Sequence, residues 1–202
     1  MVTRTPEMSA PRISTAEGML RRAVRAMAAR GPITQVSVSD LCREAGVTRD
    51  TFYRLTSSPV ALLATALDAD HDTSAVTPRV EEPPTDAPTL RAATEVLVRH
   101  VQRNQAIYRN ALNPRLPAEI RDVLQSRLES VLAPRAQVFR AEIPDVGDAR
   151  PTDADLETLV HFQAAGVVGA LEHLVRTDRI DDTDHCIDLF LAAIHFTWHT
   201  EP

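Results

Sequence analysis

Apolar residues at helical spacing recur along almost the whole chain, and this pattern constrains the fold more than any other feature. Residues 14–30 are typical, because their apolar residues follow the i, i+3, i+4, i+7 spacing of an amphipathic helix: Leu20, Ala23, Val24 and Met27. Alternating runs that would indicate strands are scarce. The sequence therefore predicts an all-α fold of about nine helices.

The first predicted helix, over residues 14–30, has clear signals at both ends. Ser14 and Glu17 match a capping box, and Gly31 with the following proline ends the periodic segment. We expect three arginines to occupy outer positions on this helix: Arg21, Arg22 and Arg25.

Two short helices and a longer one follow. Ser37 opens a helix over about 37–45, and Thr48 caps a third over about 48–54. Gly46 permits a left-handed turn between them. Pro59 suits the first position of a fourth helix.

A change of composition divides the chain into two predicted domains. Residues 72–88 contain four prolines and four acidic residues, which is typical of a linker or long loop. We therefore predict a domain over 12–70, a linker or loop over 71–88, and a second helical domain over 89–202.

Within the second domain, breaks are expected at three places. A break near Asn104 divides the segment that begins at Thr89, Pro134 kinks or ends the next helix, and a loop covers 144–151. Two further helices are expected over about 153–176 and 182–200.

These last two helices carry apolar or small residues on nearly all sides. A helix that is apolar all round is buried all round. They either lie at the centre of one core or form a subunit interface, and we favour the interface because small residues permit close helix approach. The expected interface residues are Phe162, Gly166, Gly169, Ala170, His173, Phe190, Ile194 and Trp198.

The two short helices around Gly46 have the spacing of a helix-turn-helix motif, whose second helix can enter a DNA major groove. Arg49 and Arg54 can bind phosphates or guanine edges, and the Tyr53 phenol can reach a phosphate. The same segment offers small hydroxyl groups at Ser39, Thr48 and Thr51.

The segment Val38–Arg54, VSDLCREAGVTRDTFYR, resembles the helix-turn-helix signature of the TetR family of bacterial transcriptional regulators. The resemblance spans residues 14–68, and helix order alone extends it over 89–202. It implies a homodimeric repressor that binds a palindromic operator and is released by a small-molecule effector. The DNA-binding residues carried over from it are Ser37, Ser39, Thr48, Arg49, Thr51, Tyr53 and Arg54.

The sequence departs from the family pattern just after this segment. The family's usual histidine, aromatic residue and lysine are replaced by Leu55, Thr56 and Pro59. The missing lysine removes one expected phosphate contact, although backbone N–H groups at that helix start could still bind phosphate. An alternative function is therefore a TetR-like helical dimer that has weakened or lost DNA binding and acts as an interaction protein.

The family resemblance places an effector pocket among the helices between the linker and the last helix pair. The candidate lining residues on those helices are His100, Arg103, Tyr108, Arg127, Phe139, His161 and Phe162. The chain has few aromatic residues, which favours a small or moderately polar ligand over a large aromatic one.

The distribution of charge supports the nucleic-acid hypothesis, although the formal net charge of -6 argues against it. Residues 1–65 carry nine arginines and five acidic residues, so the negative charge belongs to the rest of the chain. The chain has no lysine, so every strong cationic contact must come from an arginine fork.

Other classes of protein have little support. Cys42 and Cys186 lack metal-ligand spacing, and His195 with His199 has no third ligand, so no metal site and no cofactor are expected. No nucleophile–base pair suggests an enzyme, and a helical enzyme would need a perturbed acid–base pair in a cleft. No signal peptide or membrane span is evident, and we expect a cytoplasmic protein.

Overall fold

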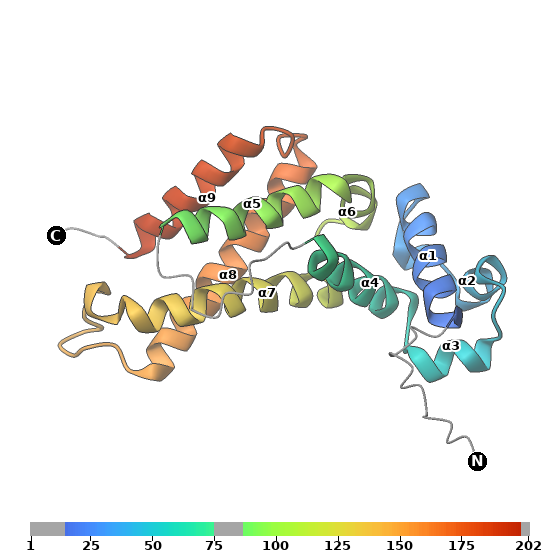
Figure 1. The fold of residues 1–202 in the computed structure, drawn as a ribbon, viewed down its shortest axis with the longest axis horizontal. Coiled ribbons are helices and arrows are strands. Elements are labelled where there is room, and N and C mark those ends of the chain that lie inside the picture. Colours follow the sequence, from blue (N-terminus) through green and yellow to red (C-terminus); the bar gives the residue numbers. More distant parts are fainter. Residues whose placement is uncertain (1–14, 75–86, 199–202) are drawn as a thin grey trace, which may run out of the picture.

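The computed structural model describes residues 15–74 and 87–198 (Figure 1). These residues form nine α-helices and no strand, which confirms the predicted all-α fold. The helices are α1 Thr15–Arg30, α2 Val38–Ala45, α3 Arg49–Leu55, α4 Pro59–Ser74, α5 Ala87–Arg103, α6 Gln105–Ala111, α7 Ala118–Val138, α8 Asp153–Arg176 and α9 Thr183–Trp198.

The first three helices form a compact unit at one end of the molecule, which we call the head (Figure 1). A 3₁₀ turn over Ile33–Gln35 joins α1 to α2. The Ile33 side chain is buried and fixes this turn against the helices. The ends of α1, α2 and α3 lie within one or two residues of the positions predicted from capping signals.

Helix α4 connects the head to the larger unit formed by α5–α9, which we call the body. It packs against α1 in the head and against α7 in the body. The predicted linker, 71–88, overlaps the ends of α4 and α5, and its central residues 75–86 lie outside the described part, as do residues 12–14.

The body is built on two helix pairs, α7 with α8 and α5 with α9 (Figure 1). The predicted break near Asn104 is confirmed, because α5 ends at Arg103 and α6 begins at Gln105. Helix α8 begins with a capping box in which the Thr152 hydroxyl accepts from the Asp155 N–H, and the Asp155 carboxylate accepts from the Thr152 N–H.

Pro134 does not end a helix, because α7 continues through it to Val138. A proline removes one backbone hydrogen bond, but tertiary packing can offset that loss. Leu132 and Ala136, on either side of Pro134, are both buried in a small cluster with Leu90 and residues of α8. This burial holds the last turn of α7 in helical form.

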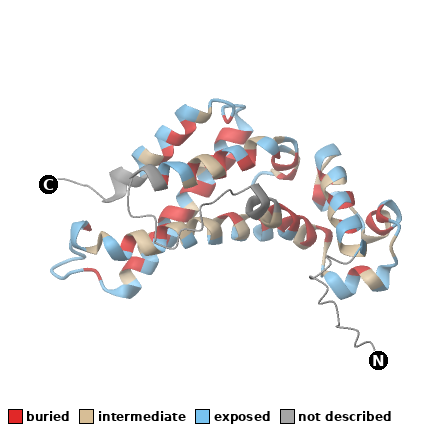
Figure 2. Cartoon of the chain, in the orientation of Figure 1, coloured by how far each residue is buried: buried red, intermediate tan, exposed pale blue. Residues whose placement is uncertain are grey.

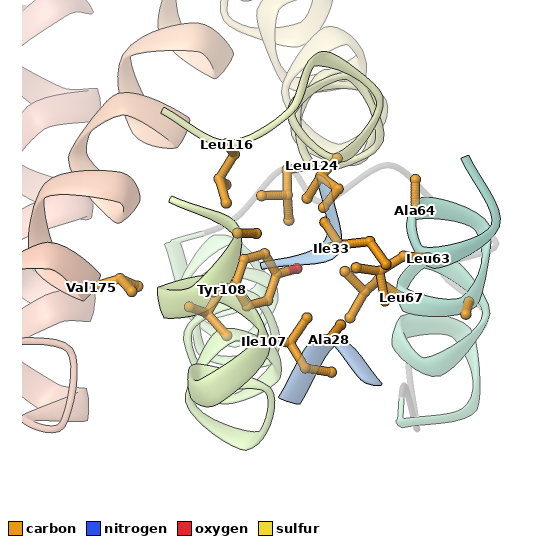
Figure 3. Close-up of a cluster of buried hydrophobic side chains, with 14 of the residues drawn as sticks. Ala28, Ile33, Leu63, Ala64, Leu67, Ile107, Tyr108, Leu116, Leu124 and Val175 are labelled. Atoms are coloured by element: carbon orange, nitrogen blue, oxygen red, sulfur yellow. The ribbon is translucent and has the colours of Figure 1, made fainter. Parts of the chain in front are cut away.

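A single cluster of buried side chains runs from the head into the body (Figures 2 and 3). Tyr108 of α6 lies near its middle, with Ala28 and Ile33 of the head on one side and Leu116 at the base of α7 on the other (Figure 3). The head therefore packs directly against the body, in addition to being connected to it through α4.

Candidate nucleic-acid interface

Helices α2 and α3 form a tight helix–turn–helix unit. Gly46 ends α2 with φ 66°, in the left-handed region that favours glycine. Leu41 and Cys42 of α2 and Phe52 of α3 are buried, with Phe52 fully so. The inner sides of α2 and α3 thus pack in the core of the head, and the opposite side of α3 is left at the surface.

Two residues predicted to touch DNA act as helix caps. The Ser37 hydroxyl accepts from the Asp40 N–H at 3.1 Å and donates to the Asp40 carboxylate at 2.7 Å. The Thr48 hydroxyl accepts from the Thr51 N–H at 3.2 Å and lies 2.9 Å from the Thr51 hydroxyl. Their first role is to fix where α2 and α3 begin, which sets the direction of α3.

The outward side of α3 presents the other predicted residues to solvent. Tyr53 is 60% exposed, and its ring packs edge-on against the buried Phe52 at a centroid distance of 5.3 Å. Arg49 and Arg54 are also exposed, at the two ends of the helix. An aromatic residue and two guanidinium groups are thus all exposed on a short helix.

The arginines of the head differ in how they are neutralised. Arg43 binds the Asp40 carboxylate, and Arg30 binds Glu44 at 3.0 Å. The hydroxyl of Ser37 and the Arg43 guanidinium hold the pKa of Asp40 below its usual value. These pairs cancel charge beside α3.

Arg49 and Arg54 keep their charge available. The Arg49 guanidinium donates to the neutral Ser39 hydroxyl, which orients the group without cancelling it. Within the described residues, neither Arg49 nor Arg54 forms an ion pair with a carboxylate.

The start of α4 offers less to a phosphate than the sequence suggested. Pro59 is buried and has no N–H, and the Ser58 hydroxyl accepts from the Ala61 N–H at 3.0 Å. Ser58 stands directly before the helix-opening Pro59, at the usual position of a cap. One donor of the first turn is therefore already occupied.

Arg25 does not take the outer position expected from the periodicity of α1. Its guanidinium donates to the Asn104 side-chain oxygen at 2.7 Å, and Asn104 in turn donates to the His100 carbonyl at 2.9 Å. Burial lowers the pKa of Arg25. The helical period of α1 carries no information about a partner on a distant segment, so sequence reasoning missed this contact.

The predicted effector residues lie at several places in the body. His100 and Tyr108 lie together, buried, with the His100 Nε2 2.9 Å from the Tyr108 hydroxyl, and burial raises the pKa of Tyr108. Arg103 is exposed, and the Arg127 guanidinium binds Asp68 of α4 at 2.6 Å. Phe139 lies under the Arg135 guanidinium at 4.5 Å.

His161 lines a surface cavity of ≈ 280 Å³ between α7 and α8. Its Nδ1 lies 2.9 Å from a Glu129 carboxylate oxygen. The floor includes the buried side chains of Leu156 and Val160, and Glu157 stands at the edge. Glu129 and Glu157 were not among the predicted ligand residues, because their separate helices show no local motif that joins them.

The residues predicted for the subunit interface fall into two groups. Phe162 is 66% exposed, and Gly166, Gly169 and His173 are exposed at successive spacings of four, three and four on α8, with half-buried Ala170 beside them. We call these four exposed residues the outward face of α8. They share one side of the helix because of its period.

The prediction that Phe190 lies at the subunit interface is wrong, because its side chain is 1% exposed and packs inside the chain's own core. Its neighbour Leu189 is 43% exposed, so at this point of α9 the exposed apolar side chain is Leu189 and not Phe190. A helix that is apolar all round does not reveal which side its own chain covers. For Ile194 and Trp198 the structure describes the helical backbone but not the side chains.

Metal sites and membrane spans are both absent from the described part of the chain. Among the side chains that the structure describes, those of residues 15–69 and 90–193, no group of three or more His, Cys, Asp or Glu is arranged to hold a metal ion. None of the described helices is both long and apolar enough to cross a membrane. Cys42 and Cys186 are both free and buried.

Comparison with solved structures decides the fold. The fatty acid degradation regulator FadR from Bacillus halodurans superposes with a TM-score of 0.57 at 14% identity, covering 92% of this chain and 97% of that one. The chain has the TetR-like fold. The predicted resemblance is thus confirmed at the level of fold.

Two solved structures of TetR regulators carry this assignment of the fold. A TetR-family regulator from Streptomyces coelicolor has a TM-score of 0.54 at 14% identity over 92% of this chain and 82% of its own. A TetR regulator from Rhodococcus sp. RHA1 has a TM-score of 0.50 at 20% identity over 91% and 98%. No protein-family profile matches the sequence, and no curated protein matches it.

Proposed function

We propose that the chain is a ligand-responsive transcriptional regulator, acting as a repressor, that binds a palindromic operator as a homodimer. The observation that carries this proposal is the outward side of α3. Tyr53 and Arg54 are exposed there, while the Phe52 side chain on the other side anchors the helix in the core. A short helix held in this way can enter a major groove about 12 Å wide.

The outward face of α8 supports dimer formation. Phe162 is a large exposed aromatic side chain, and Gly166 and Gly169 sit in the middle of a helix where glycine costs about 1 kcal/mol relative to alanine. A side chain added at either glycine would meet nothing within 4 Å in the single chain. A second copy that packs closely on this face gives a reason for both glycines.

Helix α7 supports release of DNA by a small effector. Its Arg127 binds Asp68 of α4, whose other end follows directly after the head. Glu129, two positions after Arg127 and on the other side of α7, lines the same cavity as His161. A ligand that displaces α7 at the cavity would therefore act on α4 and change the placement of the head.

A gel-shift titration of the full chain with DNA from upstream of its own gene tests DNA binding. We expect a discrete complex whose affinity falls steeply between 50 and 200 mM salt, by about a thousandfold if about six phosphates are contacted. Equal, weak binding to this DNA and to an unrelated fragment would overturn the proposal. That result would favour the alternative, a TetR-like dimer that acts as an interaction protein.

A further inference from the structure

Asp50 lies on the same outward side of α3 as Arg54. Phe52 is fully buried, and residues two positions before and after it point away from the core because each residue turns the helix by about 100°. Asp50 and Arg54 occupy these two positions, and both are exposed.

The Asp50 carboxylate differs from those of Asp40 and Glu44, which form hydrogen bonds or ion pairs within the head. Asp40 binds Ser37 and Arg43, and Glu44 binds Arg30. For Asp50, no hydrogen bond or ion pair is formed with any residue in the described part of the chain. Its favourable position near the helix start explains an acid there but does not explain a carboxylate facing outward.

A carboxylate in a major groove is selective because it can only accept hydrogen bonds. It is repelled by phosphates and by the acceptors of guanine and thymine. Cytosine presents its N4 amino donor, whereas adenine presents its N6 donor beside the N7 acceptor, which repels the second carboxylate oxygen. Cytosine is therefore the base edge that suits Asp50 best.

We propose that Asp50 is a specificity-determining residue that reads one cytosine in each operator half-site. Its place in the first turn of α3 suits this role, because the N-terminal residues of a recognition helix contact base edges. The inference rests on the proposed DNA-binding function. It assigns base selection to the acid and leaves phosphate attraction to Arg49 and Arg54.

Selection of bound DNA from a random pool, with the full chain, tests the proposal. We expect the wild type to enrich one cytosine per half-site. Asp50→Asn should change that base to adenine, because an amide can bind both N6 and N7, and Asp50→Ala should leave that position without preference. In direct titrations, exchanging that cytosine for adenine should weaken wild-type binding about tenfold and favour the Asp50→Asn variant.

The matched control is Asp148→Asn, which removes the same charge from an exposed loop of the body and should leave the selected motif unchanged. If both Asp50 variants select the wild-type motif, the Asp50 inference is overturned and the proposed function stands. If the wild type enriches no motif at all, both are overturned. Melting curves of the two variants establish that each is folded. If only one of them folds, the motif that this variant selects is enough to test the base preference.

Discussion

Arg25 in the head and Asn104 in the body are joined by a hydrogen bond of 2.7 Å across 79 positions of sequence. The Asn110 side chain adds a second connection from α6, donating to the Ala28 carbonyl at 2.9 Å. The last turns of α1 are therefore held by α6 through polar groups as well as by apolar packing. Any movement of the head relative to the body must break or carry these bonds.

We predict that Arg25 and Asn104 are energetically coupled. Because a hydrogen bond to a charged group contributes about 1.5–3 kcal/mol, Arg25→Ala and Asn104→Ala should each lower the free energy of unfolding by about 1–3 kcal/mol. The double variant should lose less than the sum by at least about 1 kcal/mol, measured by denaturant unfolding. Arg22→Ala, at an exposed position of the same helix, is the control and should change stability by less than about 0.5 kcal/mol. Strict additivity would show that the bond does not stabilise the junction.

We predict that the outward side of α3 is needed for DNA binding but not for folding. Tyr53→Ala with Arg54→Ala should weaken operator binding at least about a hundredfold, because a hydrogen bond to a charged phosphate contributes about 1.5–3 kcal/mol and two such bonds are lost. Gel shifts measure the affinity, and circular dichroism and light scattering establish that the fold and oligomeric state persist. Arg115→Ala removes one exposed arginine from the body and should leave affinity nearly unchanged. Unaltered binding by the double variant would remove α3 as the reading helix.

The head was predictable because its signals are local. A hydroxyl cap at Ser37 or Thr48, and a glycine with positive φ at position 46, each act within a few residues of themselves. The period of apolar residues then identifies Phe52 as the anchor and, by elimination, the exposed side of α3. Prediction succeeded where the determining interactions lie within one turn of helix.

The body was less predictable because its contacts are distant in sequence. Neither the packing that carries α7 past Pro134 nor the burial of Phe190 leaves a local mark. The contacts of the effector candidates are not marked locally either, since His100 and His161 lie on helices whose relative placement is set by tertiary packing. Helical periodicity shows that a residue belongs to an apolar side but not which helix covers it.

We predict that Phe162 holds two copies of the chain together. Phe162→Asp places a carboxylate in the middle of the proposed contact, where it would be buried without a partner, so the chain should become monomeric. Light scattering coupled to gel filtration gives the mass, and the helical content should be unchanged because Phe162 is exposed in the single chain. Val138→Asp introduces the same carboxylate at an exposed valine at the end of α7 and should leave the dimer intact. A Phe162→Asp chain that still forms a dimer would place the interface elsewhere.

We predict that close packing of a second copy, and not the packing of the single chain, requires glycine at positions 166 and 169 on the outward face of α8. In the single chain, neither Gly166 nor Gly169 has a positive φ, and an added Cβ meets nothing within 4 Å. Alanine at each should therefore stabilise an isolated chain by about 1 kcal/mol. In a closely packed dimer the added methyl groups hold the helices apart, and Gly166→Ala with Gly169→Ala should raise the dimer dissociation constant at least about tenfold, since overpacking costs about 1–3 kcal/mol.

Sedimentation equilibrium of the glycine variants separates these two outcomes. Gly18→Ala is the matched control, because Gly18 lies in α1 with an equally open Cβ position and no positive φ. It should stabilise the chain without changing the dissociation constant. If the α8 variant behaves like Gly18→Ala, with higher stability and unchanged association, close approach of two copies along this face is wrong, because a tightly packed helix contact does not accept two additional methyl groups without loss.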